Sequence, residues 1–186
     1  MKIHLVVAGA AALSLIAASA WAAPPAAAPT PKPAAKPAAK PVARPGVSDM
    51  AALHALWRRW LAGFNARNVD EVMAAYAPDV FVFDVTPPRQ HVGFADYKKD
   101  WQGLFAAFPS MPTTISDLKI RVVGPVAWSH VIVDSQATTK SGEKKHMVVR
   151  QTDVYRKLNG HWKIVQEHVS VPVDVMTGQS DLLSKP

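Results

Sequence analysis

Residues 150–170 read RQTDVYRKLNGHWKIVQEHVS, and this stretch decides the fold. Apolar and polar side chains alternate on both sides of Asn159-Gly160, which is the period expected of half-buried strands. Asn-Gly is the strongest short-range signal for a two-residue hairpin turn, because both residues accept a positive φ readily. We therefore expect two antiparallel strands, over 143–157 and 161–171, joined at this turn.

The register of this hairpin determines which polar side chains face the core. Gln151 and Asp153 share the more apolar face of the first strand, so Asp153 is expected to point inward. A regular two-residue turn places His168 on the same side as Asp153. One bulged residue reverses this and turns Glu167 and Val169 inward instead. The sequence leaves both registers open.

Two more strands, over 114–123 and 126–138, are expected before the hairpin. Gly124-Pro125 separates them, and such short connections imply that sequential strands pair antiparallel. Helical spacing dominates earlier in the chain. One apolar stripe predicts a helix over 49–66, and its members are Leu53, Leu56, Trp57, Trp60, Leu61 and Phe64.

A short second helix is expected between Asn68, which can cap it, and Pro78, which would end it. An apolar strand over 80–85 follows. A third helix begins near Gly93, stops at Pro109 and buries Tyr97, Trp101, Leu104, Phe105 and Phe108. The prediction is an α+β fold: three N-terminal helices packed in a strongly curved, mostly antiparallel sheet of four to six strands. Such a cone leaves a pocket at its open end.

The N-terminal segments differ from this domain in composition. Residues 1–22 have a positive start, an apolar run and an Ala20-Trp21-Ala22 cleavage pattern, which predicts a secretory signal peptide. An uncleaved anchor is the alternative. Residues 23–47 contain eight of the sixteen prolines, which predicts an extended, disordered linker. The folded domain is then 48–186, in a periplasmic or secreted protein of a bacterial envelope.

The net charge of +7 belongs mainly to these N-terminal segments. They hold five of the 21 basic residues and no acidic ones, so residues 48–186 carry a net charge of +2. This is too small a basic excess for a nucleic-acid partner. The linker cations could contact the cell envelope weakly, and a plain solubilising tether is the alternative reading.

Two stretches resemble the SnoaL-like, ketosteroid-isomerase-like proteins of the nuclear-transport-factor-2-type fold. One is RWLAGFNARNVD at 59–70, continued by APDVFVFD at 77–84, and the other is the hairpin quoted above. The hairpin is also similar to the association domain of calcium/calmodulin-dependent kinases. The resemblance covers roughly residues 50–172 and implies the curved-sheet fold. It does not fix the chemistry, because this fold hosts isomerases, cyclases, hydrolases, dehydratases and assembly modules.

Asp84 ends an apolar strand just before a proline turn. In the resembled isomerases a carboxylate at this position is the general base that removes a proton next to a carbonyl. The alternative is that Asp84 caps the Thr86-Pro87 turn. The resemblance also implies that Asp153 donates a hydrogen bond to the developing oxyanion. An ion pair with Arg156 or Lys163 is the alternative reading of Asp153.

Trp60 and Trp101 stand where the resembled isomerases have tyrosines. An indole N–H donates a hydrogen bond but does not titrate, so we expect no shared-proton network built on phenols. Trp60 is a candidate oxyanion donor, with core packing as the alternative. The remaining candidate ligand-binding residues are Trp57, Phe81, Tyr97, Trp101, Gln151 and His168.

No cofactor or metal site is predicted. The chain has no cysteine, and none of its histidines forms an H-E-x-x-H motif. Two functions remain. One is acid–base catalysis of the isomerase, cyclase or dehydratase type on a small apolar carbonyl compound, with Asp84 as base. The other is a non-catalytic ligand-binding or assembly module, tethered in the periplasm. The resemblance also implies a homodimer, because members of this family commonly pair through the outer face of the sheet, where Val148 and Val154 would lie among polar neighbours.

Overall fold

The structure is a computed structural model that describes residues 47–183. The predicted signal peptide lies outside these residues, as does the predicted linker except for Val47. The helices are α1 (Val47–Asn65), α2 (Val69–Met73) and α3 (Phe94–Ala107). The strands are β1 (Tyr76–Phe83), β2 (His91–Val92), β3 (Thr113–Val123), β4 (Val126–Thr138), β5 (Lys144–Leu158) and β6 (His161–Ser170).

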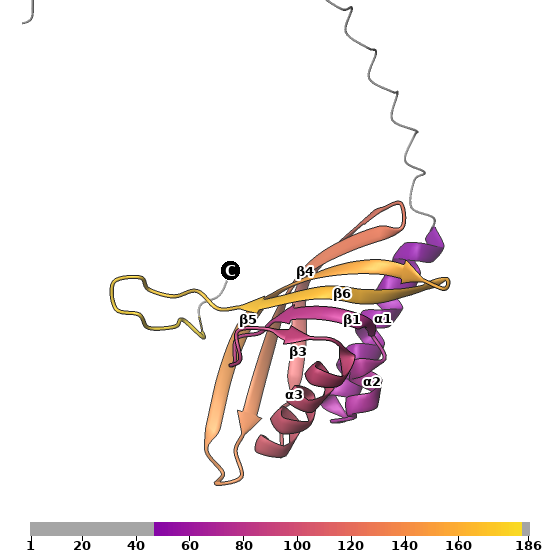
Figure 1. Cartoon of the computed structure of the whole chain (residues 1–186). Helices are drawn as coiled ribbons and strands as arrows, with labels where there is room; N and C mark the ends of the chain where they lie inside the picture. The colour runs from indigo at the N-terminus through magenta and orange to yellow at the C-terminus, as the bar shows by residue number, and fades with distance from the viewer. Residues whose placement is uncertain (1–46, 184–186) are drawn as a thin grey trace, which may run out of the picture. The chain divides into compact units, whose positions relative to one another are not determined.

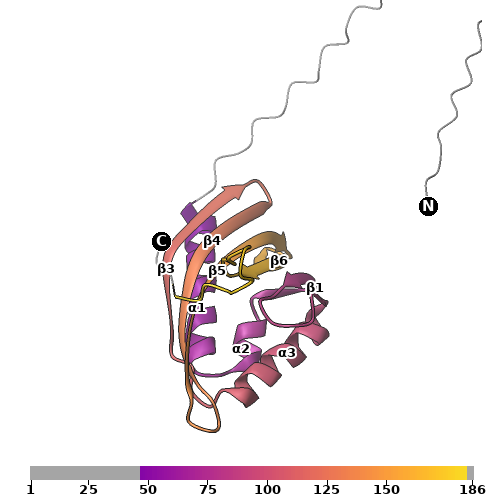
Figure 2. The same cartoon turned by 90° about the vertical axis from the view of Figure 1, so that its left-hand side faces the viewer.

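All the strands belong to one sheet of order β2-β1-β6-β5-β4-β3. Neighbouring strands are antiparallel except β1 and β6, which run parallel. The long strands β3, β4 and β5 bend strongly, and the three helices lie in the concave side of the sheet (Figures 1 and 2). This confirms the predicted α+β fold, with a curved sheet of six strands that does not close.

The β5–β6 hairpin turns at Asn159 and Gly160, whose φ angles of 49° and 81° fit a two-residue turn with positive φ at both positions. The pairing shifts farther along, because Val154 pairs with Gln166 whereas Tyr155 pairs with Ile164. One residue of β6 is therefore extra. Of the two registers left open by the sequence, the structure has the bulged one, and Asp153 lies opposite Glu167.

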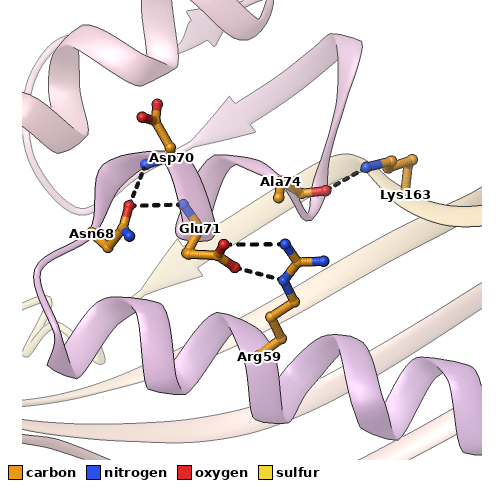
Figure 3. Close-up of polar contacts among 6 residues, drawn as sticks. All are labelled: Arg59, Asn68, Asp70, Glu71, Ala74 and Lys163. Carbon is orange, nitrogen blue, oxygen red and sulfur yellow. Dashed lines mark hydrogen bonds and ion pairs between the residues drawn. The ribbon is translucent and has the colours of Figure 1, made fainter.

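The short helix α2 is held by polar contacts to its neighbours (Figure 3). The Asn68 side chain accepts hydrogen bonds from two backbone N–H groups at the start of α2, as predicted for a cap. Arg59 of α1 forms a two-pronged ion pair with Glu71, at 2.6 and 3.2 Å. Lys163 of β6 donates to the carbonyl oxygen of Ala74, just after α2. These contacts fix α2 between α1 and the sheet.

Pro78 does not end a helix, contrary to the sequence prediction. Helix α2 stops at Met73, and Pro78 is an exposed residue within β1. The β1–β6 pairing is irregular between Tyr76 and Phe81, and this irregularity accommodates a residue that has no backbone N–H. Tyr76 is thereby a buried strand residue.

The core lies between the concave face of the sheet and the three helices. The predicted stripes of α1 and α3 face each other as a cluster of aromatic rings. Trp101 has its ring centroid 6.0 Å from Trp60, 5.4 Å from Phe64 and 5.7 Å from Tyr97. No helix within residues 47–183 is both long and apolar enough to cross a membrane.

Candidate functional site

A small cavity of about 80 Å³ lies between α1, α3 and the inner face of β4, β5 and β6. Most of its lining is apolar, and its aromatic members are Trp60, Phe64, Tyr97 and Trp101. Its carboxyl groups belong to Asp84, Asp100 and Glu167, and Gln151 adds an amide. An apolar cavity with a few convergent polar groups is the usual form of a small-molecule site, although this one is smaller than most.

Asp84 and Glu167 enter the cavity from different elements, and Tyr97 connects them. The Tyr97 hydroxyl lies 2.5 Å from Glu167 Oε1 and 3.3 Å from Asp84 Oδ2. Asp84 follows β1 and is half-buried, and its Oδ1 also accepts a hydrogen bond of 2.6 Å from the N–H of Val85. This last bond is a local turn contact of the kind that the alternative reading of Asp84 implied. Asp84 thus has one oxygen in the turn and the other toward Tyr97.

Glu167 is almost completely buried, at 1% exposure, and its carboxyl group is surrounded by donors. Oε2 accepts hydrogen bonds from the Tyr76 hydroxyl at 2.7 Å and from Gln151 Nε2 at 2.9 Å. Gln151 Nε2 also donates to Asp153 Oδ1 at 3.0 Å. The Gln151 amide therefore links the two buried carboxyl groups of β5 and β6.

Asp153 lies in a second tier behind Glu167 and Gln151, away from the cavity. Its Oδ2 accepts hydrogen bonds from the Tyr155 hydroxyl at 2.8 Å and from the Ser129 hydroxyl at 3.3 Å. The Tyr155 oxygen in turn accepts a hydrogen bond of 2.8 Å from Trp57 Nε1. A continuous polar chain thus runs from α1 through the core to the cavity.

Burial raises the pKa values of the carboxyl groups in and beside this polar chain. It raises the pKa of Glu167 well above the ordinary value, and the nearby Asp153 raises it further. It also raises the pKa of Asp153 to about 6, against the hydrogen bonds from Gln151, Tyr155 and Ser129. Burial likewise raises the pKa of Asp100, less strongly than that of Glu167. Because removal from water disfavours the charged form, the interior favours a protonated carboxyl group.

Five of the predicted site residues line the cavity, namely Asp84, Trp60, Tyr97, Trp101 and Gln151. The others do not. Asp153 and Trp57 form hydrogen bonds within the inner polar chain instead, and the buried carboxyl group that lines the cavity on this side belongs to Glu167. The Trp60 N–H also has an internal partner, the Tyr76 hydroxyl at 3.3 Å, and is not directed to a ligand.

His168 and Phe81 lie on the opposite face of the sheet. The bulge in β6 turns His168 outward, where it pairs with Thr152 and is exposed. Its ring contacts Phe83, with centroids 5.7 Å apart, and Phe83 contacts Phe81 at 4.9 Å. The assignment of His168 and Phe81 to the pocket is therefore corrected, because strand parity puts both on the outer surface.

A phenol network does exist, contrary to the expectation from Trp60 and Trp101. The three tyrosines of the chain, Tyr76, Tyr97 and Tyr155, each hydrogen-bond to a buried carboxyl group. The sequence did not indicate Tyr76 as a core strand residue, because Pro78 predicted a helix that would have included it. Tyr155 could have been found, since it shares the inward face of β5 with Asp153.

Two buried donors near the cavity lack hydrogen-bond partners among residues 47–183. Trp101 lines the cavity, and its Nε1 is buried without an acceptor. His91, at 4% exposure, has both ring nitrogens unbonded, although Nδ1 lies 3.3 Å from Asp96 Oδ2 and Nε2 lies 3.8 Å from Asp100 Oδ1. A buried unsatisfied donor is costly, so the Trp101 N–H is a natural contact for a ligand oxygen.

A wider groove of about 440 Å³ lies on another side of the domain, over Ala52, Ala55 and Leu56 of α1. Its charged side chains are already used: Arg59 pairs with Glu71, and Lys163 donates to the Ala74 carbonyl (Figure 3). Lys157 pairs with Asp49 at 2.6 Å. The charged side chains that line the groove are thus all paired, and the exposed imidazole of His161 is its remaining titratable group. Over the described residues, no set of three or more histidine or acidic side chains is arranged to hold a metal ion.

Comparisons with known proteins agree with this architecture. A family profile described as SnoaL-like domain matches residues 53–174. An NTF2-like protein of unknown function from Pseudomonas putida KT2440 has a TM-score of 0.68 at 24% identity, over 76% of this chain and 99% of that one. A ketosteroid isomerase-like protein from Erwinia carotovora atroseptica SCRI1043 has a TM-score of 0.59 at 19% identity, over 67% and 97%. No curated protein matched.

Proposed function

Because the chain belongs to the SnoaL-like domain family, we propose that it binds a small, largely apolar carbonyl compound and moves a proton within it. The reaction is of the isomerase, lyase or cyclase type, and Asp84 is its general base. One observation carries the proposal: Asp84 and Glu167, two carboxyl groups in different surroundings, line one aromatic cavity. Two carboxyl groups that share one cavity but differ in their surroundings can take different roles in acid–base chemistry.

The roles follow from the surroundings of each group. Asp84 is only half-buried, so its carboxylate can accept a proton from a carbon next to a carbonyl. The negative charge that develops on the carbonyl oxygen needs donors. Trp101 Nε1 has no other acceptor among residues 47–183, and Glu167 can donate when it is protonated. An acid kept neutral in an apolar site stabilises such an oxyanion well.

The size of the cavity limits the ligand. About 80 Å³ holds a small molecule, and a larger one requires the aromatic walls to move. No lysine or arginine of the described chain lines the cavity, so nothing there balances the charge of an anionic ligand. A small uncharged carbonyl compound meets both conditions.

The test uses ketones as probes. Acetone and cyclohexanone differ in size, and exchange of their α-protons in heavy water, followed by nuclear magnetic resonance, reports proton removal at carbon. We expect the wild-type chain to speed this exchange and Asp84→Asn to abolish the effect without loss of folded signal. Asp79→Asn, on β1 but outside the cavity, is the matched control and should retain activity.

A non-catalytic ligand-binding module is the second candidate. The hydrogen bond from the Val85 N–H to Asp84 favours it, because a carboxylate used in a turn needs no chemical role. This function predicts ketone binding without exchange, and an Asp84→Asn variant that binds like the wild type. The two functions therefore separate in a single experiment.

We further propose that the protein is exported and that the domain forms a homodimer. Export is supported by the sequence of residues 1–22, and cell fractionation together with N-terminal sequencing tests it.

The dimer is supported by large apolar side chains on the outer face of the sheet, including Trp128 at 42% exposure and Phe83 at 38%. We also propose that the proline-spaced cations of residues 23–47 contact the cell envelope weakly.

A further inference from the structure

The hydroxyl group of Tyr97 has one proton and two carboxyl neighbours. It lies 2.5 Å from Glu167 Oε1 and 3.3 Å from Asp84 Oδ2, and all three residues line the cavity. A phenol can donate only one hydrogen bond but can accept others. If Tyr97 donates its proton to Asp84, a hydrogen bond at the short contact requires Glu167 to be protonated and to donate to the Tyr97 oxygen. If Tyr97 donates to Glu167 instead, a hydrogen bond at the longer contact requires Asp84 to be protonated and to donate.

We propose that Tyr97 is a proton relay between Asp84 and Glu167. This inference rests on the proposed function for its use in catalysis, although the relay itself exists without a ligand. It makes the two carboxyl groups one acid–base unit. A proton taken from the ligand at one wall of the cavity can then be returned at the other wall.

The transfer balances within these three residues. Suppose that Asp84 has taken a proton from the ligand and Glu167 has given its own proton away. The O–H bond of Asp84 breaks and its proton joins the Tyr97 oxygen, while the original Tyr97 proton passes to Glu167. Tyr97 ends as a neutral phenol, Asp84 as a carboxylate and Glu167 as an acid. The site is then ready for the next ligand.

The surroundings of the three groups favour this exchange. Burial raises the pKa of Glu167 well above its ordinary value, so Glu167 is a good final proton acceptor. Burial also raises the pKa of Tyr97, so the phenol does not stay ionised between the two steps. The other titratable groups that face these three residues are Tyr76 and Asp153 beside Glu167, Asp100 near Asp84, and the buried His91 of β2, whose ring centroid lies 5.3 Å from that of Tyr97.

Tyr76 offers a matched control. It is as buried as Tyr97, it donates to Glu167 at 2.7 Å, and the two rings lie 5.2 Å apart. Over the described residues it has no hydrogen bond to Asp84. Tyr76→Phe and Tyr97→Phe each delete one oxygen that binds Glu167. Only the second substitution cuts the connection to Asp84.

The test follows the carboxyl carbons of isotope-labelled aspartate and glutamate by nuclear magnetic resonance, from about pH 4 to about pH 9. In the wild type, the Asp84 signal should move in two steps, and its second step should coincide with the titration of Glu167. Tyr97→Phe should remove most of that second step, and Tyr76→Phe should leave it in place. A single step in the wild type, an unchanged second step in Tyr97→Phe, or its equal loss in Tyr76→Phe would each overturn the relay.

This titration tests the relay independently of catalysis. It uses the protein without a ligand, so an intact relay in a protein that exchanges no ketone protons would contradict catalysis alone. Conversely, ketone exchange that survives in Tyr97→Phe with the wild-type rate and pH profile would leave Asp84 as the base and remove Tyr97 from the pathway.

Discussion

Glu167 lies directly opposite Asp153 across the β5–β6 pairing, and both side chains point into the core. Two carboxyl groups on adjacent strands and on one face are close neighbours. Both are buried, at 1% and 0% exposure, and the Gln151 amide donates a hydrogen bond to each. Two neighbouring negative charges repel each other, so at least one of these two carboxyl groups favours its protonated form.

The pair predicts that stability falls as pH rises. Both folded pKa values lie above the unfolded ones, and Asp153 reaches about 6. In this pair the folded chain therefore binds more protons than the unfolded chain, and the contribution of the pair to stability is largest below the ordinary carboxyl pKa values. This contribution falls as pH rises from the ordinary pKa values to the folded ones, at up to about 1.4 kcal/mol per pH unit for each extra proton that the folded chain holds. Urea unfolding at several pH values measures this slope.

Glu167→Gln should flatten this dependence, because the amide carries no charge at any pH. We expect the variant to match the wild type in acid and to exceed it in stability at alkaline pH. Glu71→Gln is the control, since Glu71 is paired with Arg59 away from the core. A steep loss of stability in Glu167→Gln at alkaline pH would show that the carboxylate form is the one that the fold requires.

Most of the fold could be predicted from the sequence because its signals are local. The Asn159-Gly160 turn, the alternation of β5 and the helical stripes each lie within a short window of residues. Pro78 misled the prediction, since the proline sits at an irregularity in the pairing of β1 with β6, a strand that is remote in the sequence. A local sequence pattern does not predict such an irregularity, because it depends on the pairing with β6.

The site was harder to predict for the same reason. One extra residue in β6 decides that Glu167 faces inward and His168 outward, and strand parity alone allows either arrangement. Asp84 and Trp101 were predicted from the family resemblance, whereas Tyr97 and Gln151 were predicted from an apolar helical stripe and from the inward face of a strand. Their connection through Tyr97 depends on how α3 packs on the sheet, which the sequence does not specify.

The cap of α2 should contribute measurably to stability. Asn68 accepts hydrogen bonds of 3.1 and 3.2 Å from the N–H groups of Asp70 and Glu71 (Figure 3). Asn68→Ala should cost about 1 kcal/mol of unfolding free energy. Asn68→Asp keeps an acceptor at the cap and should retain most of the stability. Equal losses in the two variants would mean that the cap bonds contribute nothing.

The outer face of the sheet should hold the dimer. Trp128 is exposed at 42%, and its ring lies 6.1 Å from that of His130 on the same strand. Trp128→Glu should shift the protein toward monomer in light scattering, because a charge would be buried at the interface. Val175→Glu changes an equally apolar residue beyond β6, with 89% exposure, and should not. A wild-type protein that is monomeric at all concentrations contradicts the dimer.

Two tryptophans separate ligand binding from stability. Trp101 Nε1 has no acceptor among residues 47–183, whereas Trp57 Nε1 donates to the Tyr155 hydroxyl at 2.8 Å. Trp101→Phe should therefore weaken cyclohexanone binding by about 1 kcal/mol, or about fivefold in Kd, because one hydrogen bond to the ligand oxygen is lost. Its folding should suffer mainly from the smaller ring.

Trp57→Phe should show the opposite behaviour. It removes the Trp57 N–H from the buried Tyr155 oxygen, which keeps its contact with the Ser129 hydroxyl at 2.8 Å. The lost hydrogen bond should cost about 1 kcal/mol of stability, yet Trp57 does not line the cavity. Isothermal titration with cyclohexanone and urea unfolding of both variants give the four quantities needed. If Trp57→Phe weakens binding as much as Trp101→Phe does, the affinity depends on the general packing of the aromatic cluster. In that case the Trp101 N–H is not the group that meets the ligand.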